Sequence, residues 1–174
     1  MLRHRVAGAL VSLMADTRPV RPYGGGVKQR SQIEMSPEEI DAFIAEKHTL
    51  SIATLNRDGS IHMVAMWYGF LEGEIAFTSK AKAQKVVNLR RNPNITVMVE
   101  EGEAYNELVG VQIRGVAEIV EDPERMFEAG VSVFERHTGP YTEDRRKNVE
   151  SLLYKRVVIK VNPTKIASWD HRKL

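Results

Sequence analysis

Three short segments of alternating polarity, joined by very short turns, constrain this chain more than any other feature. The first segment covers Leu50–Leu55, and Asp58-Gly59 leads into a return segment, Ile61–Phe70. Glu72-Gly73 then leads into a third segment, Glu74–Thr78. Alternation with a period of two indicates β-strands, and an Asp-Gly pair between them indicates a hairpin. The three strands predict an antiparallel meander, because parallel strands would need crossover helices for which the turns leave no room.

The rest of the chain alternates further strands with short helices. Ser36-Pro37-Glu38-Glu39 is a capping box that starts a helix ending near Lys47. The other predicted elements are helices over Lys82–Arg91, Asp122–His137 and Asp144–Leu153, and strands over Ile95–Val99, Val109–Val120, Val157–Val161 and Lys165–Trp169. Asn162-Pro163 is expected to separate the last two strands. This order predicts a mainly β protein: a closed or half-open antiparallel barrel of about six to seven strands with short peripheral helices.

Length and composition indicate one domain and exclude few partners. Residues 1–35 show no sustained period and contain Gly24–Gly26, so we expect a flexible arm before a domain covering residues 36–174. No apolar run approaches the roughly 20 residues that cross a bilayer. The net charge of +2 argues for neither a nucleic acid nor a membrane partner, and the absence of cysteine suits a reducing, cytoplasmic location. Because strands at a barrel seam commonly face a second subunit, we expect a homodimer.

The stretch Thr78–Lys85 carries the strongest chemical signal. It leaves a strand and enters the predicted helix with Lys80, Lys82 and Lys85. Cations at a helix N-terminus oppose the helix dipole, which costs about 0.3–1 kcal/mol for each charge. A bound anion would reverse that cost, because backbone N–H groups, hydroxyls and ammonium groups could all reach one phosphate. Lys82 and Lys85 are three residues apart, so we expect them on one helical face. A solvated basic turn is the alternative, and spacing alone does not decide between the two.

Several motifs in a fixed order resemble a known family. They are Leu50–Gly59, Met66-Trp-Tyr68, Ile75–Pro93 (ending Asn-Leu-Arg-Arg-Asn-Pro) and Ser168-Trp-Asp-His-Arg-Lys-Leu174. From about Ser36 to Leu174 the chain resembles the pyridoxamine 5′-phosphate oxidase-like superfamily of FMN-binding split β-barrels. Its motifs are most similar to those of the actinobacterial flavin/deazaflavin oxidoreductases that use coenzyme F420. The resemblance implies a split barrel and a redox cofactor.

The resemblance also implies which residues bind that cofactor. Lys85 matches the phosphate-binding lysine of the family, and Val64–Tyr68 matches the strand that lies against the flavin or deazaflavin ring. We expect Met66 and Trp67, on an inner strand, to wall that ring, and Trp169 either to cover the ring or to close the barrel end. The full set of expected cofactor-binding residues is Met66, Trp67, Tyr68, Thr78, Ser79, Lys80, Lys82, Gln84, Lys85, Asn88 and Trp169.

Two departures from the family pattern bear on the activity. Gln84 stands where pyridoxamine phosphate oxidases carry an arginine, and Ser168–Arg172 replaces their substrate-gripping Arg-Leu-His-Asp-Arg run. Both argue against vitamin B6 oxidation. The lysine-rich segment, with Arg90 and Arg91 nearby, suits the longer anionic tail of F420. The implied function is hydride transfer between reduced F420 and an unsaturated organic substrate, with FMN as the alternative cofactor.

No side chain stands out as catalytic. Tyr68, Tyr105 and His171 are candidate proton donors, although each residue is more typical of packing. The histidines form no spacing typical of a metal site. A non-catalytic protein that binds the cofactor, or a tetrapyrrole, therefore stays open as an alternative. A nucleic-acid module is the weaker one, because no aromatic residues are interleaved with the basic residues.

Overall fold

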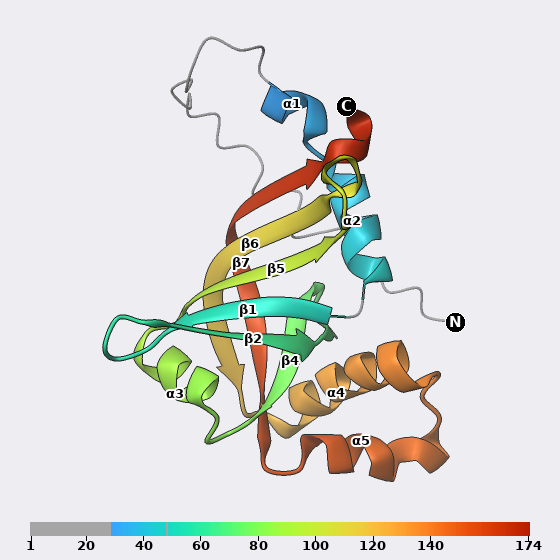
Figure 1. Cartoon of the computed structure of the whole chain (residues 1–174). Coiled ribbons are helices and arrows are strands. Elements are labelled where there is room, and N and C mark those ends of the chain that lie inside the picture. The colour runs from blue at the N-terminus through green and yellow to red at the C-terminus, as the bar shows by residue number, and fades with distance from the viewer. Residues whose placement is uncertain (1–28, 48) are drawn as a thin grey trace.

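The protein forms one curled antiparallel sheet with helices packed around it (Figure 1). The computed structural model describes residues 29–47 and 49–174. The strands are β1 (Thr49–Leu55), β2 (Ile61–Trp67), β3 (Gly69–Leu71), β4 (Glu74–Lys80), β5 (Asn94–Glu101), β6 (Val109–Val120) and β7 (Arg156–Asp170). The helices are α1 (Gln29–Ile33), α2 (Pro37–Glu46), α3 (Gln84–Arg91), α4 (Pro123–Thr138) and α5 (Arg146–Leu153), with short 3-10 turns η2 (Tyr105–Glu107), η3 (Glu143–Arg145) and η4 (His171–Lys173). The predicted half-open barrel is confirmed. Among the described helices, none is long and apolar enough to cross a bilayer.

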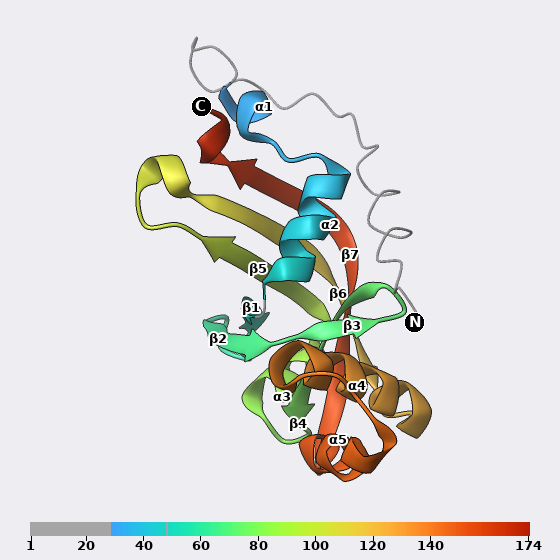
Figure 2. The ribbon, with the colours of Figure 1, turned by 90° about the vertical axis from the view of Figure 1, so that its right-hand side faces the viewer.

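The order of the strands explains how the barrel closes. The sheet runs β2-β1-β5-β6-β7-β4-β3, and all its neighbouring strands are antiparallel. Its two edge strands, β2 and β3, are consecutive in sequence and separated by Tyr68 alone. The chain therefore crosses from one edge of the sheet to the other within one residue, so the sheet has to curl until its edges meet (Figures 1 and 2).

This crossing overturns the predicted meander. The pattern predicts one strand over Ile61–Phe70, but the chain breaks at Tyr68, and only its first half pairs with β1. The break has a packing cause: the Tyr68 side chain is fully buried, and its hydroxyl donates to the Ile44 carbonyl over 2.7 Å. Gly69 lies against α4 so closely that a Cβ there would be 2.7 Å from the Ser132 hydroxyl. The second half pairs with β4 through the Glu72-Gly73 turn, where both residues have positive φ.

The predicted break at Asn162-Pro163 is also wrong, because β7 continues through it to Asp170. The ladder between β6 and β7 shifts its register between Arg114 and Gly115, and this bulge accommodates a proline that has no N–H to donate. A glycine is needed at the bulge, since a Cβ on Gly115 would lie 2.5 Å from the Asn162 carbonyl oxygen.

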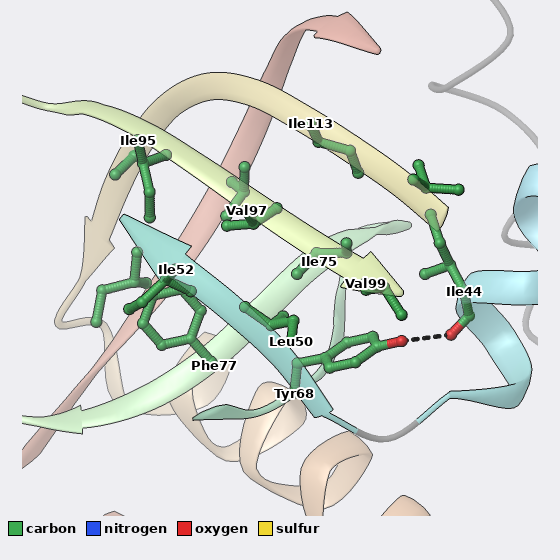
Figure 3. Close-up of a cluster of buried hydrophobic side chains, with 14 of the residues drawn as sticks. Ile44, Leu50, Ile52, Tyr68, Ile75, Phe77, Ile95, Val97, Val99 and Ile113 are labelled. Atoms are coloured by element: carbon green, nitrogen blue, oxygen red, sulfur yellow. Dashed lines mark hydrogen bonds between the residues drawn. The ribbon is translucent and has the colours of Figure 1, made fainter. Parts of the chain in front are cut away.

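The core fills the inside of the curled sheet. Inward side chains of β1 and β5, such as Leu50, Ile52 and Val97, meet Ile75 and Phe77 of β4 across the interior (Figure 3). Helix α2 contributes Ile40, Phe43 and Ile44 to the same cluster, and it begins at Ser36 with the predicted capping box. A smaller cluster lies where α4 and α5 pack on β3, β4 and β7.

The segment before α2 contributes to this core. Residues 29–33, which the sequence places in the flexible arm, form α1 beside β7, and Met35 is buried. The Met35 amide donates to the Ser168 hydroxyl over 3.1 Å. Residues 1–28 of the predicted arm lie outside the described residues.

Candidate functional site

The junction between β4 and α3 brings the predicted phosphate-binding segment to the end of the barrel. Thr78 and Ser79 are buried at the end of β4. The Ala81 amide donates to the Lys155 carbonyl over 3.1 Å, and the Ala83 amide donates to the Lys80 carbonyl over 2.9 Å. These two bonds close a tight turn over residues 81–83 and fix the direction in which α3 leaves the sheet.

The turn changes the predicted geometry of the lysines. Helix α3 begins at Gln84, so Lys82 lies in the turn before it, and the prediction that Lys82 and Lys85 share a helical face is wrong. Within α3, Val87 is 49% exposed whereas Asn88 is fully buried. The chain needs a turn between the strand and the helix, and the spacing of the lysines does not indicate at which residue that turn ends and α3 begins.

Asn88 attaches α3 to β1. Its side-chain amide donates to the Thr54 hydroxyl over 3.1 Å and to the Asn56 side-chain oxygen over 2.8 Å. Its own oxygen accepts from Gln84 over 2.9 Å. Gln84 in turn lines an open cavity of about 380 Å³ with Asn56, Arg57 and Asp58 of the β1–β2 hairpin. The predicted site residues Gln84 and Asn88 thus hold the first turn of α3 in place beneath that hairpin.

Four cations gather at the junction without acidic partners. Lys80 of β4 is directly opposite Arg156 of β7, although like charges in that position destabilise a sheet. Lys85 is half-buried, and burial lowers its pKa, with a further lowering from the nearby Arg156 guanidinium. Throughout the described ranges, none of Lys80, Lys82, Lys85 and Arg156 forms an ion pair. The junction is therefore a site of uncompensated positive charge.

Two polar groups at the junction are also unpaired. Ser79 is 2% exposed, and its hydroxyl oxygen is buried without a hydrogen-bond partner. Helix α3 has Ala83 at its N-cap, so no side chain there accepts from the first N–H groups of the helix. Buried hydroxyls are normally hydrogen-bonded, and an unpaired one costs about 1–3 kcal/mol. An uncapped helix start, an orphaned hydroxyl and uncompensated cations together fit a phosphate.

Arg90 and Arg91 have partners elsewhere in the described residues. Arg90 forms an ion pair with Glu121, and Arg91 donates to the Leu55 carbonyl. That both suit the anionic tail of a longer cofactor stays a prediction. Arg156 gives no sequence signal for this site, because it is far from Lys80 in the chain. Only the pairing of β4 with β7 brings the two together.

The strand expected against the cofactor ring divides its side chains between two faces. β2 is an edge strand and not an inner one. Met66 packs against the inner cluster, while Trp67 points outward, is 58% exposed and stacks on His137 with ring centroids 4.3 Å apart. Tyr68 is fully buried, and burial raises its pKa to about 12. Its hydroxyl, already donated to Ile44, therefore stays protonated and serves the fold.

The remaining aromatic candidates lie at the other end of β7. Trp169 is thirteen residues beyond Arg156, which is about 40 Å along an extended strand. Its indole covers Gly110 so closely that a Cβ there would be 2.2 Å from the ring. His171 packs edge-on against Tyr105 at 4.5 Å, and its Nδ1 is buried without a partner. Within this protomer, these residues are not part of the junction.

Comparison with known proteins agrees with this architecture. The family model described as pyridoxamine 5′-phosphate oxidase matches residues 36–170. The chain belongs to this family. A search of curated proteins found no match.

Solved structures extend the comparison. A conserved hypothetical protein from Mycobacterium tuberculosis, Rv2991, is 47% identical over 84% of this chain and 92% of its own, with a TM-score of 0.81. A protein named F420 Reductase is 28% identical over 73% of this chain and 94% of its own, with a TM-score of 0.55. The heme storage protein HutZ from Vibrio cholerae is 20% identical over 76% of this chain and 94% of its own, with a TM-score of 0.61, and shares the fold.

Proposed function

We propose that the β4–α3 junction binds the phosphate of a flavin-type redox cofactor and that the protein is an oxidoreductase. One observation carries this proposal: Lys80, Lys85 and Arg156 lie together at the junction without acidic partners among the described residues, and the neighbouring Ser79 hydroxyl is buried and unpaired. A phosphate would accept from the hydroxyl, from the first N–H groups of α3 and from the cations. Charge-assisted bonds of this kind are about twice as strong as neutral ones.

Coenzyme F420 is the cofactor that we propose first, with FMN as the alternative. Support comes from the family, from the 28%-identical protein named F420 Reductase, and from the lysine-rich turn. When bound, the cofactor supplies the hydride chemistry through its ring. The protein holds the phosphate at the junction, and Met66 or Trp67 of β2 offers an apolar wall for the ring. The substrate that we propose is a small unsaturated organic molecule.

Non-catalytic binding of the cofactor, or of a tetrapyrrole, is the second candidate. The Tyr68 hydroxyl, next to the proposed ring-binding residues, is buried and already bonded to Ile44, so it offers no free acid or base. A protein that only stores or carries its ligand needs none. Both candidate functions use the β4–α3 junction to bind the ligand. They differ in that only the first predicts catalytic turnover.

We further propose that the protein works as a homodimer. The outward side chains of edge strand β2 are Ile61, Met63, Ala65 and Trp67, all apolar and all exposed. Apolar patches of this kind on a protein surface mark interaction sites. A second subunit would cover this face.

The experiment that tests the function is a side-by-side titration of the full-length protein with F420 and FMN, followed by turnover. We expect saturable quenching of deazaflavin fluorescence, a higher affinity for F420 than for FMN, and oxidation of reduced F420 by an unsaturated acceptor. Binding without turnover across a panel of acceptors would favour the storage protein. If neither cofactor binds, the assignment of the junction fails.

A further inference from the structure

Two residues other than glycine have a left-handed backbone in the described ranges, and their side chains differ in what they contact. Glu72 has a φ of 54°, and Lys155 has a φ of 56°. Residues with a Cβ rarely adopt this conformation, because it brings the Cβ close to the following carbonyl oxygen. The Glu72 carboxylate forms ion pairs with Arg125 and Lys160, so the fold itself uses this side chain.

Lys155 has no comparable contact for its charge. The residue is exposed, and its ammonium group lies over the Tyr154 ring at 4.9 Å. An aromatic ring attracts a cation but does not neutralise it. Across the part of the chain that the structure describes, Lys155 forms no ion pair. A charged side chain therefore stands at a position that suits glycine, without an acidic partner to account for it.

The turn that holds Lys155 lies against the β4–α3 junction. It connects α5 to β7, and the Lys155 carbonyl accepts from the Ala81 amide over 3.1 Å (Figure 1). Lys82 follows Ala81 in the turn before α3, is exposed, and has no ion pair among residues 29–47 and 49–174. Lys82 and Lys155 are thus exposed cations on the two turns that this hydrogen bond joins.

The charge at the junction is larger than one phosphate can balance. With Lys155 included, five cations occupy neighbouring positions on β4, α3, β7 and the two turns: Lys80, Lys82, Lys85, Lys155 and Arg156. A phosphate group carries about two negative charges at most. A ligand whose only anionic group is a phosphate would therefore leave most of these charges without a counterion. A further anionic group would relieve their mutual repulsion.

We propose that the cofactor bound at the junction carries a second anionic group beside its phosphate, and that Lys82 and Lys155 bind this second group. The inference rests on the proposed function and narrows the class of its ligand. The Ser79 hydroxyl, buried and unpaired in a residue that is 2% exposed, is the independent observation that a ligand binds at this end of β4. The second group is a phosphate in a flavin dinucleotide or a carboxylate in the tail of F420, and FMN lacks it.

Lys155→Gly tests the inference in titrations of the full-length protein with FMN, FAD and F420. We expect the wild type to bind FAD or F420 more tightly than FMN. For that longer cofactor, the dissociation constant should rise about fivefold in the variant, because an exposed ion pair is lost. The constant for FMN should change by less than about twofold. Whether FAD or F420 shows the loss identifies the source of the second anionic group.

The stability of the cofactor-free variant gives a second readout with the opposite sign. Glycine adopts a φ near 56° without strain, so Lys155→Gly should leave the melting temperature unchanged or raise it by up to about 4 °C. Lys155→Arg is the matched control, because it keeps both the charge and the strained backbone. It should agree with the wild type in melting temperature and in all three titrations.

Three results would overturn the second subsite. An equal loss of affinity for FMN and for the longer cofactor would mean that Lys155 contacts the first phosphate. Unchanged affinity for all three cofactors would remove Lys155 from the site. A wild type that binds FMN as tightly as FAD and F420 would contradict the need for a second anionic group. A wild type that binds none of the three overturns the proposed function itself, which the other results leave intact.

Discussion

Arg136 and Arg156 are both half-buried, yet their surroundings differ completely. Arg136 of α4 donates to the carbonyls of Tyr68, Ala45, Ile44 and Lys47, and its guanidinium lies over the Tyr68 and Phe70 rings at 4.7 and 4.8 Å. Arg156 faces Lys80 and lies near Lys85. The first arginine satisfies backbone groups where the barrel closes, and the second leaves its charge open. Burial and charge alone therefore do not distinguish a cation that stabilises the fold from one that binds a ligand. The groups that surround each side chain, acceptors for Arg136 and cations for Arg156, do distinguish them.

The sharpest test of this contrast is Arg136→Met. It keeps the apolar stem but removes the Arg136 hydrogen bonds to four carbonyls, of which that of Ile44 keeps the Tyr68 hydroxyl as a donor, and it removes the ring contacts. We expect the free energy of unfolding to fall by about 3 kcal/mol, since hydrogen bonds to charged groups are worth about 1.5–3 kcal/mol each and several are lost. Urea unfolding measures the change. Arg156→Met is the matched control and should change stability by no more than about 0.5 kcal/mol. Equal losses in the two variants would refute the contrast.

The second test is Lys85→Met, which removes a cation of the junction. We expect the dissociation constant for the cofactor to rise by about one to two decades, corresponding to a lost charge-assisted bond of about 1.5–3 kcal/mol. The stability of the cofactor-free protein should stay the same or increase, because a half-buried ammonium beside Arg156 is removed. Lys147→Met, an exposed lysine on α5, is the control for binding. Unchanged affinity for both F420 and FMN would remove Lys85 from the site.

A third and smaller effect follows from Ser79→Ala. In the cofactor-free protein the hydroxyl is buried without a partner, so its removal should leave stability unchanged or raise it by about 1 kcal/mol. The same change should weaken cofactor binding about fivefold, through one lost hydrogen bond. Thermal melts and titrations of the same preparations check both signs. A variant that loses stability and binds normally would mean that Ser79 serves the fold.

Much of the fold follows from local sequence, and the rest depends on long-range pairing. The capping box at Ser36, the Asp58-Gly59 hairpin and the strand Val109–Val120 are confirmed, because their signals lie within a few neighbouring residues. The break at Tyr68 was missed, since its cause is a hydroxyl bond to α2 and the packing of α4 on Gly69. The alternation of polar and apolar residues looks the same whether a segment forms one long strand or two strands at opposite edges of the sheet.

The candidate site shows the same division. Thr78, Ser79, Lys80 and Lys85 were predicted from their position between a strand and a helix together with the family resemblance, and the structure brings them to one junction. That they bind a cofactor stays a prediction. Arg156 was missed because it reaches the junction only through the pairing of β4 with β7. The stacking of His137 on Trp67 was missed for the same reason. Residues adjacent in the sheet but distant in the chain leave no periodic signal in a single sequence.

The last and smallest effect is a pH dependence that isolates Lys85. Burial, and then Arg156, lowers its pKa in the folded protein, whereas in the unfolded chain its pKa has the ordinary value near 10.5. Between the lowered pKa and 10.5 the unfolded chain binds more protons than the folded one, so the free energy of unfolding gains a contribution that rises with pH. Other groups titrate in this range too. The measured quantity is therefore the difference between wild type and Lys85→Met in urea unfolding across this window.

A bound phosphate shifts the pKa of Lys85 in the opposite direction, and this makes the affinity for the cofactor depend on pH. It favours the ammonium form of Lys85 and raises its pKa again, so cofactor binding takes up a proton and weakens as the pH rises through the lowered pKa. We expect the affinity of the wild type to fall across that window, while that of Lys85→Met stays flatter. Parallel affinity curves for the two proteins would mean that the ammonium group of Lys85 does not face the cofactor, and Arg156 would then be the main cation of the junction.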